Sequence, residues 1–287
     1  MLRRTFGCVR LVWNKTLAAR QARKSLTGTH VSYAETDRAL TALKKTDEFS
    51  FLREVPAVSL QQVLRHQHAA FANFYAGRAR YPRFETRDGR QSAHFIRGAF
   101  RIRDDGLFLS KTSVPLSYVW AFREVDFTTP NPSTVVVSLE PDGRWYVTFV
   151  VEVEDPQPLT PSGREVGIDL GLKNLVVTNS GERIPNPCHL ERKAKNLARY
   201  QRRMSRRQAG SKNRAKAKRK VAAAHRKIRD ARVDHLQKTT TRLVREHDMI
   251  AIEGLAPANM AKNRQLARSI HGASWGELRR QLEYKAR

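Results

Sequence analysis

The chain has 287 residues, enough for two or three modest domains, and its 54 Lys and Arg against 27 Asp and Glu give a formal net charge of +27. That excess opposes compaction by self-repulsion and favours a polyanion, nucleic acid above all, as the partner. No apolar run reaches the roughly 18–20 residues of a membrane-spanning helix and no signal-peptide pattern opens the chain, so we expect an intracellular protein without a membrane partner.

Residues 1–79 are predicted to be helical. Apolar residues recur at helical spacing in three stretches, around Leu11 and Leu17, around Leu40, and most clearly from Leu60 to Phe74. The first helix begins almost at Met1, without a convincing cap.

From residue 81 the period of the apolar pattern changes to two, which predicts strands. The alternating runs lie at 93–96, 100–103, 107–109, 119–122, 134–139 and 145–153. Pro141-Asp142-Gly143 separates the last two runs and predicts a hairpin turn. We expect a small antiparallel sheet or barrel over about residues 80–155, followed by a linker at 155–163.

Residues 165–177, EVGIDLGLKNLVV, read as a strand, a tight glycine turn and a second strand. Asp169 would end the first strand next to the hydrophobic layer of a sheet, where an unpaired charge is costly. A cation, a metal ion or an exit to solvent would remove that cost. The motif alone is also what an ordinary strand and turn contain.

A second acid, Glu253, closes the apolar run 249–252. Two buried strands that each end in a carboxylate would supply what a two-metal phosphodiester site needs, since such sites hold Mg²⁺ ions roughly 3.5–4 Å apart. Asp169 and Glu253 are therefore the candidate catalytic and metal-binding residues.

The segment between these acids is strongly basic. Residues 192–232 hold 18 Lys or Arg and one acid, Asp230, and Gly210-Ser211 interrupts a helical apolar stripe. We expect two long helices joined by a basic connection that contains Arg206, Arg207, Lys212, Arg214, Lys216, Lys218, Arg219 and Lys220. Most charge runs are merely solvated, but the acids that would balance such a helix are missing here, which favours contact with phosphates.

The end of the chain is predicted to form a polar loop at 256–264 and then a helix near 274–285, capped by Ser274. Cys8 and Cys188 are the two cysteines, too few for a disulfide framework or a four-cysteine zinc site.

With these segments described, the chain resembles the TnpB family, also called OrfB-type transposases. The resemblance covers nearly the whole chain. It rests on VRLVWNKTLA at 9–18, SLQQVL at 59–64, YPRF at 81–84, GIDLGLKNL at 167–175, IAIEGL at 250–255 and NMAKNRQLARSIHGASWGELRRQLEYKA at 259–286.

The resemblance implies an α+β multidomain fold in three parts: a helical recognition lobe (1–79), an antiparallel wedge-like β-barrel (80–157) and an RNase-H-like RuvC α/β domain (163–287) with a long basic helical insert. In that domain the strands that end at Asp169 and Glu253 are neighbours. Such proteins are transposon-encoded RNA-guided DNA endonucleases, so the resemblance also implies a prokaryotic, cytoplasmic and nucleoid-associated protein.

The implied partners are a guide RNA made from the transposon end and double-stranded target DNA, and the implied cofactor is Mg²⁺. In such proteins base pairing between guide RNA and target DNA recognises the target sequence. The protein itself recognises a short motif beside the target and the shape of the nucleic-acid backbone. Tyr33 and Gln61 are the polar lobe residues expected at that motif, with plain exposure on helices as the alternative. The remaining candidate nucleic-acid-binding residues are Arg199, Arg202, Arg203, Arg206, Arg207, Lys212, Lys216, Lys218, Arg219, Lys220, Lys262, Asn263 and Arg264.

The chain departs from the family pattern at both ends. The family's first barrel strand is absent, and so are the four-cysteine zinc ribbon and the segment with the third RuvC aspartate. We therefore expect no zinc site, an incomplete metal pair and impaired cleavage, since losing one carboxylate costs orders of magnitude in rate. The alternatives are an RNA-guided DNA-binding module that does not cut and a decayed transposon fragment without activity.

Overall fold

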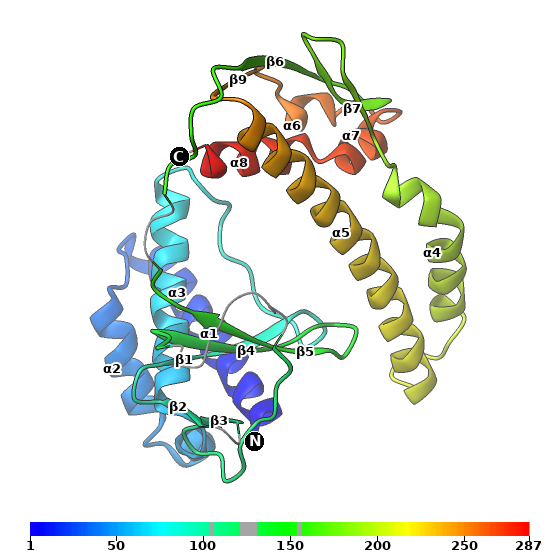
Figure 1. Ribbon diagram of the computed structural model, residues 1–287. Coiled ribbons are helices and arrows are strands. Elements are labelled where there is room, and N and C mark those ends of the chain that lie inside the picture. The colour runs from blue at the N-terminus through cyan, green and yellow to red at the C-terminus, as the bar shows by residue number, and fades with distance from the viewer. Residues whose placement is uncertain (104–105, 121–130, 154–156, 287) are drawn as a thin grey trace. The chain divides into compact units, whose positions relative to one another are not determined.

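A computed structural model describes residues 1–103, 106–120, 131–153 and 157–286, and the chain divides into two compact units, Met1–Glu154 and Asp155–Arg287 (Figure 1). Each unit has its own hydrophobic core. None of the described helices combines the length and the apolar character that a bilayer crossing requires.

The first unit opens with helices α1 (Leu2–Thr27), α2 (Tyr33–Leu43) and α3 (Ala57–Tyr75), with a 3₁₀-helix at Asp47–Glu54 before α3. As predicted, α1 begins directly after Met1 without a side-chain cap. It ends at Gly28, whose positive φ of 67° is the left-handed conformation that glycine adopts at little cost. The three predicted helical stretches are therefore confirmed.

A capping box begins α2. The Ser32 hydroxyl accepts a hydrogen bond from the Glu35 N–H at 3.2 Å, and Glu35 Oε2 accepts one from the Ser32 N–H at 2.8 Å. The Ser32 N–H and hydroxyl, together with the Arg23 guanidinium, lower the pKa of Glu35 to about 2.

Because the folded pKa of Glu35 lies below its unfolded value, this carboxylate stabilises the fold at pH above the unfolded value, and the contribution is lost as the pH falls toward 2. We expect Glu35→Gln to lower the thermal unfolding midpoint at about pH 6, and to lower it much less near pH 2. Melting followed by circular dichroism at both pH values measures this. Glu48→Gln, an exposed change outside the capping box, is the control; an equal loss at both pH values would contradict the assignment.

The β part of the first unit contains a three-stranded antiparallel sheet and a separate hairpin. The sheet has the order β1 (Gln91–Ile96), β4 (Thr134–Leu139), β5 (Trp145–Val150), and the hairpin pairs β2 (Phe100–Arg103) with β3 (Gly106–Leu109). The predicted turn between β4 and β5 is confirmed, with the Gly143 N–H donating to the Glu140 carbonyl at 2.8 Å.

Three predictions for this region need correction. The described residues form no closed barrel, because the three-stranded sheet and the β2–β3 hairpin are separate sheets. The last strand ends at Val150 rather than at 153. Residues 119–120 form no strand, while 121–122 lie outside the described residues, as do 155–156 of the predicted linker.

The helices and the sheet of the first unit share one core. Phe6 of α1, Leu64 of α3, Phe95 of β1 and Val135 of β4 are all at most 1% exposed and belong to the same cluster. The predicted helical lobe and the predicted β region are therefore packed together in this unit.

The second unit is built on a four-stranded sheet of order β8 (Arg183–Pro185), β7 (Asn174–Thr178), β6 (Glu165–Leu170), β9 (Met249–Ile252). The first three strands form an antiparallel meander, whereas β9 lies parallel to β6. A parallel neighbour requires a crossover, and two long helices supply it: α4 (His189–Ser205) and α5 (Lys212–Glu246).

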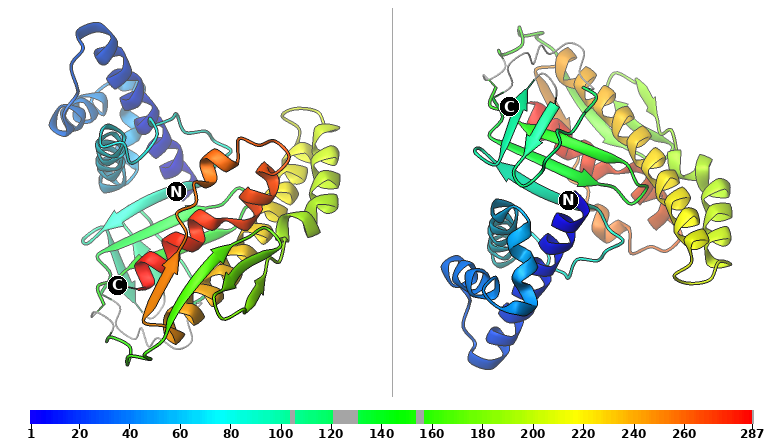
Figure 2. Two further views of the ribbon diagram at one scale, coloured as in Figure 1. Left: turned by 90° about the horizontal axis from the view of Figure 1, so that it is seen from above. Right: turned by 90° about the horizontal axis from the view of Figure 1, so that it is seen from below.

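One face of this sheet is covered by α5 and by the last helix, α8 (Trp275–Lys285) (Figures 1 and 2). Ile168 and Val176 pack there against Leu243 and Leu278, which are both fully buried. Side chains alternate along a strand, so Gly167 and Asp169 belong to the opposite face, where Asp169 is exposed.

The helical predictions for the second unit also need correction. The predicted basic connection is short, because α4 and α5 are joined by residues 206–211 and the basic residues from Lys212 onward lie inside α5. The expected loop at 256–264 contains a short helix, α6 (Pro257–Met260), and α7 (Ala267–Ala273) follows it. Ser274 precedes α8 but does not cap it, because its positive φ of 56° is left-handed and its hydroxyl donates to the His271 carbonyl.

Candidate active site and nucleic-acid interface

The register of β6 and β9 places the two candidate acids side by side. Ile168 pairs with Ile252 in the parallel ladder, so Asp169 and Glu253 are the next residues on adjacent strands, which run about 4.8 Å apart. Both chains run in the same direction, so both acids lie at the same edge of the sheet. The neighbouring placement that the resemblance implied is present.

The surroundings of these acids agree with one of the three alternatives that the sequence left open, an exit to solvent. Asp169 and Glu253 are exposed, and β9 is a half-exposed edge strand whose Met249 is 57% exposed. The carboxylates leave the hydrophobic layer because they extend from the face that α5 and α8 do not cover. The negative charges of Asp169 and Glu253 are therefore exposed to solvent and are not buried beneath the sheet.

Glu253 is held by the backbone of β6. Its Oε1 accepts a hydrogen bond from the Leu170 N–H at 3.0 Å, which leaves the second carboxylate oxygen available. The turn that follows Leu170 is close-packed, because a Cβ at Gly171 would lie 2.7 Å from the Asn174 carbonyl oxygen. Glycine is therefore required next to the acids for steric reasons.

An open hollow of about 390 Å³ contains both acids and also Asn179, which sequence reasoning missed. Asn179 follows β7, and its N–H donates to the Gly167 carbonyl at 2.9 Å, which places it on the β6 backbone. An amide oxygen is a ligand that hard cations accept. A polar residue directly after β7 was the available signal, but the sheet order was needed to use it.

Within the described residues no three His, Cys, Asp or Glu side chains form a group able to hold a metal ion. Two carboxylates with one amide nevertheless fit Mg²⁺, because that ion is commonly held by one or two carboxylates together with water and substrate phosphates. A second ion would need further donors.

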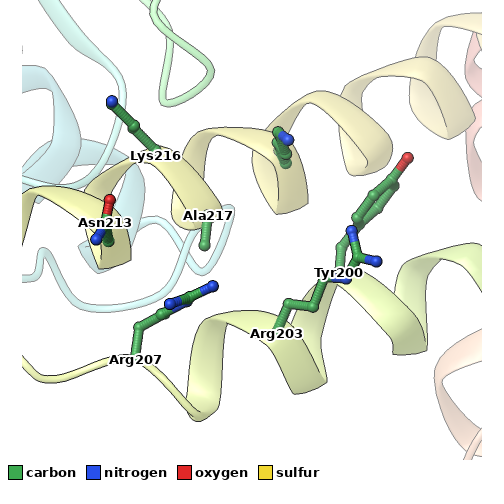
Figure 3. A pocket seen from close by; sticks show the side chains of 7 residues that line it. Tyr200, Arg203, Arg207, Asn213, Lys216 and Ala217 are labelled. Atoms are coloured by element: carbon green, nitrogen blue, oxygen red, sulfur yellow. The ribbon is translucent and has the colours of Figure 1, made fainter.

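The structure brings several of the predicted basic residues together between α4 and α5. One hollow of about 420 Å³ is lined by Arg203 of α4, Arg207 of the following turn, and Lys216 and Lys220 of α5 (Figure 3). Tyr200 and Asn213 line it as well and were not predicted. Tyr200 was missed because its place on the inner side of α4 depends on the pairing of the two helices.

The turn between these helices is braced from inside. The Ser211 hydroxyl caps α5 by accepting the Arg214 N–H at 3.1 Å. The Arg214 guanidinium donates to the carbonyls of Met204 and Arg207 at 3.1 and 2.9 Å. Arg214 therefore closes the end of α4, where cations are favourable.

The other predicted nucleic-acid-binding residues are more scattered. Arg199 lines a second hollow, and Arg202, Arg206, Lys212 and Arg219 are exposed without lining either one, while Lys218 is half-buried. Lys262, Asn263 and Arg264 form an exposed turn after α6.

In the first unit, Tyr33 is half-buried at the start of α2, 6.4 Å from the His68 ring, with the Arg65 guanidinium 5.9 Å from its centroid. Gln61 is exposed on α3.

Comparison with known proteins identifies relatives along the whole chain. The family model described as a probable transposase of the OrfB type matches residues 148–264, and a helix-turn-helix domain model of the same transposases matches residues 1–26, which contain nearly all of α1. A protein of Streptomyces pristinaespiralis named "Putative RNA-guided DNA endonuclease" is 47% identical over 286 residues, which cover 99% of this chain and 70% of that relative.

A protein of Escherichia coli named "Putative RNA-guided DNA endonuclease InsQ" is 31% identical over 301 residues, covering 99% of this chain and 73% of that relative. The similarity thus includes α1, the β6–β9 sheet and the basic helices. The chain belongs to the OrfB transposase family, whose TnpB-like relatives are named RNA-guided DNA endonucleases.

Proposed function

We propose that the chain is a transposon-associated RNA-guided DNA endonuclease whose phosphodiester cleavage depends on Asp169 and Glu253. The observation that carries this proposal is the pair of carboxylates at the same edge of adjacent parallel strands, on the exposed sheet face. The sheet order, an antiparallel meander followed by a parallel strand after a helical crossover, supports an RNase-H-like RuvC domain. The names of the relatives support the guided activity.

Asp169 and Glu253 would hold Mg²⁺, with Asn179 as a further oxygen donor at the same hollow. When bound, the ion would stabilise negative charge on the phosphoryl oxygens and would activate water for the attack on phosphorus. The Leu170 N–H orients Glu253 by fixing one of its oxygens, and the open hollow admits a strand to the carboxylates. The proposal includes one ion, because a second ion would need carboxylates beyond Asp169 and Glu253.

The guide RNA would come from the transposon end and would pair with double-stranded target DNA, so that pairing reads the sequence. Tyr33 and Gln61 are proposed to contact the short motif beside the target. The positive charge of α4 and α5 supports phosphate contacts by the second unit, and Lys262, Asn263 and Arg264 add an exposed basic turn.

We expect Arg203→Glu to weaken nucleic-acid binding. We also expect it to reduce the magnitude of the slope of log affinity against log salt concentration by about 0.7–0.9, the contribution of one phosphate contact. Titration of a labelled oligonucleotide at several salt concentrations measures this. Arg245→Glu, an exposed reversal on α5 away from both hollows, is the matched control. An equal reduction in both variants would show that only net charge matters.

A second candidate function is RNA-guided DNA binding that blocks a site without cutting it. The small number of carboxylates at the site favours this function, because the described residues bring only two of them together. One oxygen of Glu253 also accepts a backbone hydrogen bond already. This function would need the basic helices but not the complete metal site.

Sequencing the RNA that co-purifies with the chain tests the shared part of both functions, when the protein is expressed with the DNA that flanks its gene. The expected result is one discrete RNA with a constant scaffold. A mixture of cellular RNAs without a common scaffold would contradict guide binding.

A further inference from the structure

We propose that the groove between α4 and α5 binds one unpaired strand of nucleic acid, with a base stacked on Tyr200. The inference rests on the proposed function and adds the strandedness of the ligand and the residue that contacts a base. The groove is defined by Arg199, Tyr200 and Arg203 of α4, by Arg207 of the following turn, and by Lys216, Lys220 and Lys227 of α5.

The groove is continuous along the helix pair. Two hollows, of about 420 and 440 Å³, share Tyr200, Arg203 and Lys220 in their linings. The first extends toward the turn between the helices, and the second extends toward the sheet end of α4, past Arg199. Tyr200 therefore lies in the middle of the groove, and any strand that follows the groove passes it.

Lys and Arg side chains line both hollows, and none of the described residues contributes a carboxylate to either one. The acids of neighbouring turns of α5 are engaged elsewhere: Asp230 pairs with Arg226 and Arg229, and Asp234 pairs with Lys238. A phosphate chain would thus meet only positive charge in the groove, which is the electrostatic requirement for tracking a backbone.

The spacing of the cations suits consecutive phosphates. Arg199 and Arg203 lie four residues apart on one side of α4, a step of about 6 Å along the helix axis, and Arg207 follows in the turn after the helix. Lys216 and Lys220 repeat the same step on α5. This step is comparable to the separation of neighbouring phosphates in an extended strand.

The width of the groove selects against a duplex. The two helices pack directly on each other, with axes about 8–10 Å apart, so the groove is a narrow furrow along their contact that a double helix is too wide to enter. A duplex could touch the rim cations but could not reach Tyr200. A single strand can enter, because Ala217, Ala223 and Ala224 on the α5 side leave space opposite the tyrosine.

Tyr200 and the adjacent Arg199 together offer a surface on which a base can stack. Its ring is half-buried, and the Arg199 guanidinium lies 5.4 Å from the ring centroid, so an arginine and an aromatic face lie together as in single-strand binding sites. Asn213 lines the same hollow, and its amide can donate to or accept from a base edge (Figure 3).

The test uses the full chain with Asp169→Ala and without Mg²⁺, so that cleavage plays no part, and 12-nucleotide probes of RNA and DNA that carry one 2-aminopurine. Tyr200→Leu is expected to weaken single-strand binding roughly tenfold and to remove the stacking-dependent quenching of the probe. Tyr200→Phe, which keeps the ring, should bind within about twofold of the parent. Arg245→Gln is the control for charge outside the groove.

Duplex probes of the same sequence should lose little affinity in Tyr200→Leu. Comparison of the RNA and DNA probes identifies which strand the groove prefers, and either preference agrees with the proposal. Equal effects of Tyr200→Leu on single strands and duplexes, or unchanged quenching in the variant, would overturn it, provided that circular dichroism shows the helices intact. A failure to find a guide RNA would leave this binding result unaffected, so the two proposals fail separately.

Discussion

Asp169→Asn is expected to abolish DNA cleavage by the protein–RNA complex, by at least about 100-fold, while RNA binding stays within about twofold. The change keeps the size of the side chain but removes the charge from the exposed edge where β6 and β9 end together. Glu253→Gln should have the same effect. Single-turnover cleavage of a matched target, together with RNA filter binding, measures both quantities.

Glu165→Gln is the matched control for this prediction. Glu165 lies in the same strand and on the same exposed face, four residues before Asp169, but at the opposite end of β6. Its substitution should leave cleavage close to that of the parent. If Asp169→Asn and Glu253→Gln both retained cleavage, these two carboxylates would not form the site.

Leu243→Ala is expected to destabilise the second unit by about 2–5 kcal/mol, because the change removes a fully buried side chain and leaves a cavity. Leu243 lies on α5 in the cluster that contains Ile168 and Leu278, beneath the strand that bears Asp169. Chemical denaturation monitored by hydrogen exchange in β6 and β7 measures the effect on this unit separately.

Val233→Ala on the same helix is the control, since Val233 is 37% exposed and its truncation should cost less than about 0.5 kcal/mol. Faster exchange in β6 and β7 for Leu243→Ala alone would link the core to the site. Equal destabilisation by both substitutions would contradict the packing role of Leu243, because replacement by alanine does not lower helix propensity.

Local patterns predicted most of the elements. The Pro-Asp-Gly turn between β4 and β5 and the break at Gly210-Ser211 were predictable because Gly143 and Gly210 adopt a positive φ there, which glycine does without steric cost. The pairing of the strands that bear Asp169 and Glu253 came instead from the family resemblance, since no local pattern brings residues so distant in sequence together.

Features that depend on three-dimensional pairing were left open or missed. The exposure of Asp169 depends on which face of the sheet α5 and α8 cover, and alternation alone leaves both choices open. Tyr200 lies at the groove because α4 turns that side toward α5. Ser274 resembled a cap, but its left-handed backbone directs the hydroxyl back to His271.

The most direct test of guided cleavage at Asp169 and Glu253 is a change of the guide. The purified complex is given a guide RNA with a new targeting segment, and a plasmid that carries both the old and the new target is incubated with Mg²⁺. The expected result is cleavage that moves to the new target and disappears in Asp169→Asn. Cleavage that stays at the old target, or that survives in Asp169→Asn, would contradict the account.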